Sequence, residues 1–211
     1  MTDGKAHTPR LAQATGVALA GGQSRRMGAD KAGMRLGGQT LIARAVERLG
    51  LVFERVIVIG PGELSAYAPG APIFADEEPG QGPLGGLATA LRRVESDWLF
   101  LAACDMPFIQ PGLVRSMAEQ ALGRSEARVV AMRGPKGWEP LHAMYQRSVA
   151  SAVERALVES RLSLRALLDE VGALEVAPAD VARLDPQGIS AFNANTPEEW
   201  AWAQRLAAGG G

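Results

Sequence analysis

Residues 17–31 read VALAGGQSRRMGADK, an apolar run that ends at two glycines and opens into a loop with three cationic side chains. A short apolar run bounded by glycine is typical of a buried strand. Similar runs recur further down the chain. Buried strands are therefore expected at residues 17–20, 56–59, 72–75, 98–104 and 128–132, of which 72–75 carries the weakest pattern.

Amphipathic segments alternate with these runs, and Thr40 and Pro83 stand where helix N-termini are expected. Helices are predicted at residues 40–49, 83–94, 111–122, 149–159, 164–171 and 197–206. Wholly apolar strands that alternate with helices indicate a mostly parallel sheet covered on both faces. The sequence thus predicts an α/β fold: a single Rossmann-like domain over residues 15–207, preceded by a flexible lead-in over residues 1–14.

Composition limits the function classes. Of 211 residues, 47% are hydrophobic, which is enough for a full core, and the net charge of −1 argues against a broad basic surface for nucleic acid. Cys104 is the only cysteine, so no internal disulfide forms, and a reducing, cytoplasmic location is expected. No apolar run approaches the roughly 20 residues of a membrane span, and no signal peptide is evident.

The loop at residues 21–31 is a candidate phosphate-binding loop, because ligands of such sheets bind beyond the carboxyl ends of the strands. Glycines let backbone N–H groups approach an anion, and Arg25, Arg26 and Lys31 add positive charge. Lys31 carries the most weight, since the chain has only three lysines. The spacing matches neither a P-loop nor a dinucleotide fingerprint. The alternative is an ordinary glycine turn with solvated charges.

Two carboxylates follow predicted strands at the same edge. Asp105 comes directly after the most apolar strand, and Asp76 follows the weak strand at residues 72–75. Mg²⁺ prefers oxygen ligands and uses few protein carboxylates, so Asp105 is a candidate metal ligand. One or two carboxylates opposite a cationic loop suit a magnesium–nucleotide site. The alternative for Asp105 is a turn or N-cap aspartate before Pro107.

Other positions leave two interpretations open. The glycine-rich segment at residues 82–87 either brings a helix N-terminus to a ligand or packs tightly on the sheet. Asn193 and Asn195 either recognise a ligand or only precede Thr196, an ordinary N-cap. His142 has no cluster of metal-binding residues around it, so neither a zinc site nor a Ser-His-Asp triad is expected. Cys104 is expected to be a small buried hydrophobe.

Taken together, residues 19–31 resemble the signature loop of the molybdenum cofactor guanylyltransferases. Residues 82–87, 104–108 and 193–199 are similar to later motifs of that family, in the same order. The resemblance implies transfer of GMP from GTP to the terminal phosphate of molybdopterin, with release of pyrophosphate and with Mg²⁺ as cofactor. It also implies other proteins of molybdenum cofactor or molybdoenzyme maturation as partners.

The resemblance assigns roles by position. Implied catalytic residues are Arg26, Lys31 and Asp105; implied nucleotide contacts are Leu19, Ala20, Gly21, Gly22, Lys31, Asp76 and Asp105; implied acceptor contacts are Asn193 and Asn195. Asp105 is the implied Mg²⁺ ligand, and Gly22 favours the guanylyl over the cytidylyl branch. Three alternatives stay open: a molybdopterin cytidylyltransferase, a sugar-phosphate nucleotidyltransferase and a non-enzymatic nucleotide-binding regulator.

Overall fold

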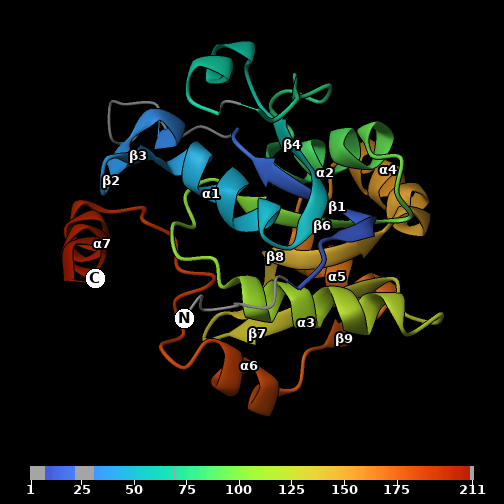
Figure 1. Cartoon of the computed structure of the whole chain (residues 1–211). Coiled ribbons are helices and arrows are strands. Elements are labelled where there is room, and N and C mark those ends of the chain that lie inside the picture. The colour runs from blue at the N-terminus through green and yellow to red at the C-terminus, as the bar shows by residue number, and fades with distance from the viewer. Residues whose placement is uncertain (1–7, 22–30, 69, 210–211) are drawn as a thin grey trace.

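The computed structural model describes residues 8–21, 31–68 and 70–209, with only the backbone of Lys31. Its centre is a seven-stranded sheet in the order β5-β4-β1-β6-β8-β7-β9 (Figure 1). The strands are β1 (Leu11–Leu19), β4 (Phe53–Ile59), β5 (Ile73–Phe74), β6 (Trp98–Ala103), β7 (Val129–Gly134), β8 (Gly137–Gln146) and β9 (Leu174–Glu175). A separate hairpin pairs β2 (Arg35–Leu36) with β3 (Gln39–Thr40).

The direction of each strand decides which strand ends lie at the same edge of the sheet. β1 runs parallel to β4 and β6, and β4 is parallel to β5. β8 is antiparallel to both β6 and β7, so β7 and its parallel partner β9 point the same way as β6. The mostly parallel sheet predicted from the apolar runs is confirmed. The carboxyl ends of all its strands except β8 therefore lie along one edge.

Helices cover both faces of the sheet, as the sequence predicts (Figure 1). They are α1 (Leu41–Gly50), α2 (Gly82–Arg93), α3 (Pro111–Leu122), α4 (Ala150–Val158), α5 (Leu164–Val171), α6 (Pro178–Leu184) and α7 (Pro197–Gly209), with short 3-10 turns at Lys31–Gly33, Gly62–Ala66 and Arg147–Val149. α1, α3 and α6 pack on one face, and α2, α4 and α5 on the other. Successive side chains of β1 point to opposite faces of the sheet and so contribute to the hydrophobic core on each face. Ala18 faces α1, and Val17 and Leu19 face α2.

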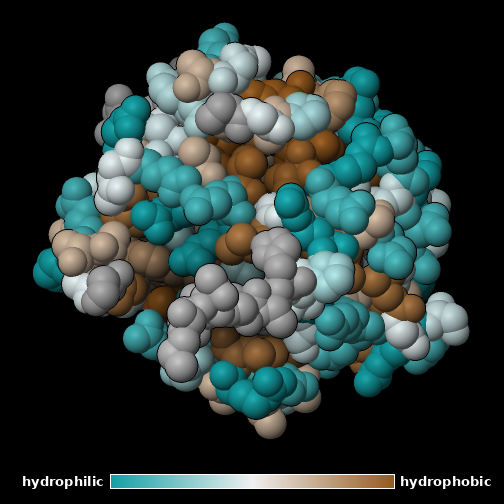
Figure 2. Space-filling view, in the orientation of Figure 1, coloured by the Kyte–Doolittle hydropathy of each residue, from teal (hydrophilic) through white to brown (hydrophobic). Residues whose placement is uncertain are grey.

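α7 stands apart from the sheet, beside the β2–β3 hairpin (Figure 1). A small third core joins them, in which Leu36, Leu41 and Ala203 are buried together with Phe108 and Ile189. Elsewhere the face seen in Figure 2 is mainly hydrophilic, with smaller hydrophobic areas between the elements. In the described part of the chain, no helix combines the length and apolar character needed to cross a membrane.

Several boundaries differ from the sequence prediction. The predicted lead-in extends to residue 14, but β1 begins at Leu11, whose N–H donates to the Val52 carbonyl at 2.8 Å. Ala14 is already buried and pairs with Trp98, so residues 11–14 belong to the sheet. The hairpin, β8, β9 and α6 are absent from the prediction. β8 escapes it because Pro140 and His142 interrupt its apolar run.

Candidate functional site

The carboxyl ends of β1, β4 and β6 form the middle of the ligand-binding edge. The Ala20 N–H donates to the Ile59 carbonyl at 2.8 Å, and the Cys104 N–H donates to the Leu19 carbonyl at 3.0 Å. Leu19 and Ala20 are each 5% exposed, whereas Gly21 is exposed and has open space around the position of a Cβ. The backbone at Leu19 and Ala20 is thus partly engaged by the sheet, and Gly21 is the first residue with room for a ligand.

The glycine-rich segment at residues 82–87 packs closely against this strand end. A Cβ at Gly86 would collide with Cδ1 of Leu19, and one at Gly85 would lie 2.6 Å from the Glu78 carbonyl oxygen. Tight packing of helix on sheet therefore explains both glycines. Gly82, by contrast, begins α2 with a φ of +61° and has nothing within 4 Å of a Cβ. The contact with Leu19 brings the first turns of α2 beside the end of β1.

The structure describes only the two ends of the candidate phosphate-binding loop. Gly22, Arg25 and Arg26 lie outside the described residues, and so does the side chain of Lys31. The backbone of Lys31 begins the 3-10 turn Lys31–Gly33, directly before Ala32, which is 3% exposed in the core under α1. The far end of the loop is thus anchored to the core on the α1 face.

Asp105 lies two residues beyond the end of β6, half-buried in a turn in which the Met106 N–H donates to the Ala103 carbonyl at 3.2 Å. Its own backbone carbonyl accepts a hydrogen bond from the Ala194 N–H at 3.2 Å. Ala194 stands between Asn193 and Asn195. The structure therefore brings the predicted metal ligand and the predicted acceptor residues together, although they lie far apart in the sequence.

Asp76 has a different environment. Its Oδ1 accepts hydrogen bonds from the Glu78 N–H and from the Thr89 hydroxyl, each at 3.0 Å, and Thr89 is buried on α2. This carboxylate therefore holds the turn between β5 and α2.

Although Asp76 and Asp105 share one edge, β4 and β1 lie between their strands. Three strand spacings amount to roughly 14 Å, whereas Mg²⁺–oxygen distances are about 2 Å. The strand ends that precede the two carboxylates are therefore not neighbours in the sheet. Within the described ranges, no group of three or more His, Cys, Asp or Glu residues could hold a metal.

The segment around the asparagines serves the helix as well as the site. Thr196 caps α7: its Oγ1 accepts from the Glu199 N–H at 3.1 Å, while Glu199 Oε2 accepts from the N–H groups of Asn195 and Thr196. The Asn193 side chain is half-buried and donates to the Ala191 carbonyl at 3.3 Å. The N-cap interpretation of Thr196 is confirmed, and the capping box also fixes the backbone that carries the asparagines.

A buried polar cluster behind this segment is absent from the sequence prediction. His142 and Ser190 are fully buried, with Nε2 of His142 and Oγ of Ser190 2.7 Å apart, and Asp185 is 3% exposed. Burial lowers the pKa of His142 to about 4, so its ring is neutral near pH 7. The cluster is not a catalytic triad, because Asp185 accepts from backbone N–H groups rather than from the histidine. His142 is isolated in sequence, so only the fold reveals its partners.

A second group of charged residues surrounds the β7–β8 hairpin. The Arg133 guanidinium stacks 3.8 Å from the ring centroid of Trp138, and the Arg165 Nε donates to the Trp138 carbonyl at 2.9 Å. Glu139 is half-buried against Gly134. Burial raises the pKa of Glu139, and the nearby positive charges of Arg165 and Lys136 oppose that shift. In the sheet, the β7–β8 hairpin and β1 lie on opposite sides of β6.

Comparison with known proteins agrees with this geometry. The MobA-like NTP transferase domain family matches residues 16–176. A probable molybdenum cofactor guanylyltransferase from Pelotomaculum thermopropionicum is 34% identical over 93% of the chain and 95% of that protein. A molybdenum cofactor guanylyltransferase from Syntrophotalea carbinolica is 34% identical over 87% of each chain. The crystal structure of molybdopterin-guanine dinucleotide biosynthesis protein A from Archaeoglobus fulgidus superposes with a TM-score of 0.79 at 26% identity, covering 92% of this chain and 98% of that one.

Proposed function

The chain belongs to the MobA-like NTP transferase domain family, and on that premise we propose that it transfers GMP from GTP to the terminal phosphate of molybdopterin. Pyrophosphate is released, and molybdopterin guanine dinucleotide forms. The observation that carries the proposal is the hydrogen bond from the Ala194 N–H to the Asp105 carbonyl, 3.2 Å long. It joins the candidate metal ligand to the asparagines proposed for the acceptor, as a transfer between two bound substrates requires.

Charge is the main obstacle to this reaction, because both substrates are polyanions. We assign Arg26 and Lys31 to the triphosphate, where their positive charge offsets repulsion between donor and acceptor. Asp105 fits a magnesium site, since it is a half-buried carboxylate at the carboxyl edge of the sheet. When bound there, Mg²⁺ would neutralise charge on the phosphate oxygens. Positioning and electrostatics then supply most of the rate.

The chemical step needs no covalent intermediate on the protein. An oxygen of the molybdopterin phosphate attacks the α-phosphorus of GTP, and the bond to the departing pyrophosphate breaks in line with it. Cys104, the nucleophilic residue type next to Asp105, is only 8% exposed and packs in the core. We therefore assign it to packing rather than to catalysis.

Recognition of the base is proposed for the backbone at the end of β1. Of the predicted contacts Leu19, Ala20, Gly21 and Gly22, the first two already share backbone groups with the sheet. Gly21 has open space and is the best-supported contact with guanine. Asp76 would contact the nucleotide through Oδ2, because Oδ1 holds the turn before α2.

The acceptor side is proposed to consist of Asn193 and Asn195. Their neutral amides can donate to and accept from a pterin or its phosphate, each hydrogen bond contributing roughly 0.5–1.5 kcal/mol. The proposal extends to the compartment: with Cys104 as the only cysteine, the chain suits the reducing cytoplasm. Other proteins of cofactor or molybdoenzyme maturation are the proposed partners.

GTP turnover with and without molybdopterin tests this function against its alternatives. We expect pyrophosphate release that requires GTP, Mg²⁺ and molybdopterin together. Release with a sugar phosphate in place of molybdopterin would identify a sugar-phosphate nucleotidyltransferase instead. GTP binding without turnover under any of these conditions would identify a nucleotide-binding regulator.

A further inference from the structure

The chain between α6 and α7, residues 185–196, has no regular secondary structure, yet its backbone is well paired. Its N–H donors at residues 188, 189, 190, 192, 194, 195 and 196 all make hydrogen bonds. The Asp185 carboxylate holds one end, accepting from the Ile189 and Ser190 N–H groups at 3.0 and 2.8 Å. Glu199 holds the other end, and Asp105 holds the middle.

Ser190 joins this segment to the rest of the fold. Its hydroxyl accepts a hydrogen bond from the Gln110 N–H at 2.9 Å, just before α3. The same oxygen lies 2.7 Å from Nε2 of His142 on β8. A single buried hydroxyl thus connects the 185–196 segment to α3 and to the centre of the sheet. In Figure 1 this segment runs from α6 past the start of α3 to reach α7.

Ser190 makes two hydrogen bonds through one oxygen. Its Oγ accepts from the Gln110 N–H, and a serine hydroxyl can accept once more or donate its proton. The neutral His142 ring pairs with this hydroxyl through Nε2, as acceptor or donor according to its tautomer. Phe100 packs edge-on against the ring at 5.0 Å between centroids and limits its rotation. The histidine is therefore a fixed hydrogen-bond partner of Ser190.

We propose that Ser190 and His142 are positioning residues that hold Asn193 and Asn195 against Asp105 for binding of the phosphate-bearing acceptor. The inference rests on the proposed function, because it takes the asparagines as acceptor contacts. Ser190 precedes Asn193 by three residues, and the Ala194–Asp105 hydrogen bond follows directly after. Loss of the Ser190 hydroxyl removes the hydrogen bonds that join this stretch to α3 and to β8. The acceptor site then loosens, while the carboxyl end of β1, on the other side of β6 from β8, keeps its contacts.

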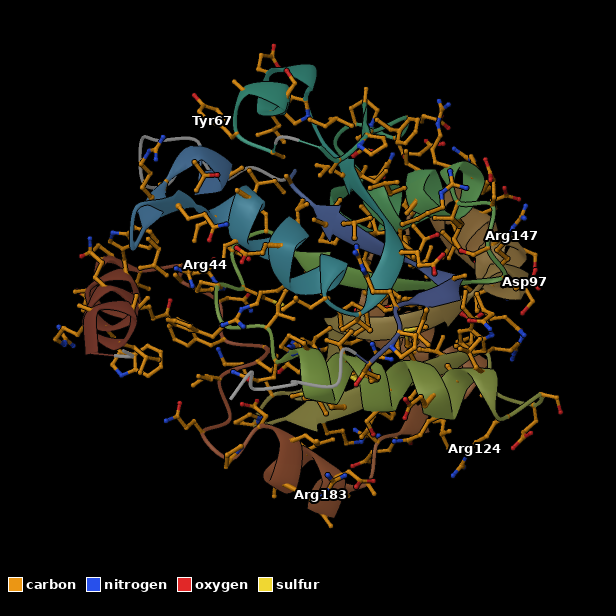
Figure 3. The ribbon with its side chains drawn as sticks, viewed as in Figure 1. Arg44, Tyr67, Asp97, Arg124, Arg147 and Arg183 are labelled. Carbon is orange, nitrogen blue, oxygen red and sulfur yellow. The ribbon has the colours of Figure 1, made fainter. Side chains whose placement is uncertain are left out.

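Matched variants separate positioning from simple loss of stability. Ser190→Ala removes the anchor. His142→Leu removes the hydrogen-bond partner of Ser190, and His142→Gln restores a partner of similar size that can donate or accept. Thr15→Val is the control. Thr15 is 3% exposed, and its hydroxyl makes a 2.8 Å hydrogen bond with that of Ser96. Ser96 precedes Asp97 at the opposite end of β6 (Figure 3), so this variant loses a buried hydroxyl contact far from the candidate site.

We expect Ser190→Ala and His142→Leu to raise the KM for molybdopterin about tenfold, with the Kd for GTP within about twofold of wild type. His142→Gln should recover most of the lost affinity. In hydrogen exchange, amides of residues 189–195 should exchange at least about tenfold faster in Ser190→Ala. Thr15→Val should lower the melting temperature similarly but change neither the KM nor exchange in this segment.

Two results would overturn the inference: an unchanged KM and unchanged exchange in Ser190→Ala, or equal behaviour of His142→Gln and His142→Leu. Failure of the proposed function would look different. Wild-type protein would then show no GMP transfer to molybdopterin, while hydrogen exchange would still report whether Ser190 orders residues 189–195.

Discussion

Asp105→Ala should abolish turnover while the fold stays intact. The backbone carbonyl of Asp105, which accepts from the Ala194 N–H, is retained by alanine, so the segment that carries the asparagines stays in place. Its neighbours Cys104 and Met106 are buried and provide the packing of the turn, whereas the Asp105 side chain is only half-buried. The variant therefore removes a carboxylate without opening a core cavity.

The size of the effect follows from the charge removed. Metal binding contributes several kcal/mol to stabilisation of charge in the transition state, and about 1.4 kcal/mol corresponds to a tenfold change in rate. Loss of the ligand should thus lower kcat/KM by at least about a hundredfold, and more if no water replaces the carboxylate. The melting temperature should fall by less than about 4 °C, the shift expected for 1 kcal/mol in a domain of this size.

Asp97→Ala is the matched control, because Asp97 stands at the opposite end of the same strand (Figure 3). Its backbone carbonyl also accepts a hydrogen bond across elements, from the Arg147 N–H at 2.8 Å. The assay is pyrophosphate release at increasing Mg²⁺, paired with thermal unfolding of both variants. Asp97→Ala should retain wild-type turnover. If Asp105→Ala retained turnover within about tenfold of wild type at saturating Mg²⁺, its role as metal ligand would be refuted.

Three further predictions concern other parts of the molecule. Gly86→Ala should cost roughly 1–3 kcal/mol of stability, measured by thermal unfolding, because the added Cβ displaces Leu19. It should also weaken GTP binding, measured by calorimetry. A variant as stable as wild type would contradict the packing role of Gly86. Glu139→Gln should raise the melting temperature at pH 7 but not near pH 4. Burial raises the folded-state pKa of Glu139, so wild-type stability falls as pH rises through that pKa, and a pH-independent difference would contradict this. Lys31→Ala should weaken GTP binding and slow turnover together, since the positive charge of Lys31 offsets phosphate charge in both ground and transition states. A variant in which calorimetry shows weaker GTP binding but turnover is unchanged, or the reverse, would argue against this role.

The parallel strands β1, β4, β5, β6 and β7 could be predicted because each contains a short apolar run. β8 could not, since Pro140 and His142 give it a mixed pattern although both sides of the strand are covered. α6 carries no fully buried residue and so shows little amphipathic signal. Apolar periodicity reports burial, and elements that bury few apolar side chains escape it.

The candidate site likewise has features that could be predicted from the sequence and features that could not. The position of Asp105 at the carboxyl edge could be predicted, because it directly follows an apolar run that forms a parallel strand. The separation of Asp76 from Asp105 requires the strand order, which no local pattern carries. Likewise, the meeting of Ala194 with Asp105 and of Ser190 with His142 depends on the path of an irregular segment across the fold.

Guanylyl transfer can be followed directly through the labelled α-phosphate of GTP. The purified chain is incubated with Mg²⁺, molybdopterin and α-labelled GTP or CTP, and labelled dinucleotide is measured together with released pyrophosphate. We predict that label from GTP moves to molybdopterin with one pyrophosphate released per dinucleotide, and that CTP reacts at least about tenfold more slowly. A preference for CTP, or label from GTP that never reaches molybdopterin, would contradict it.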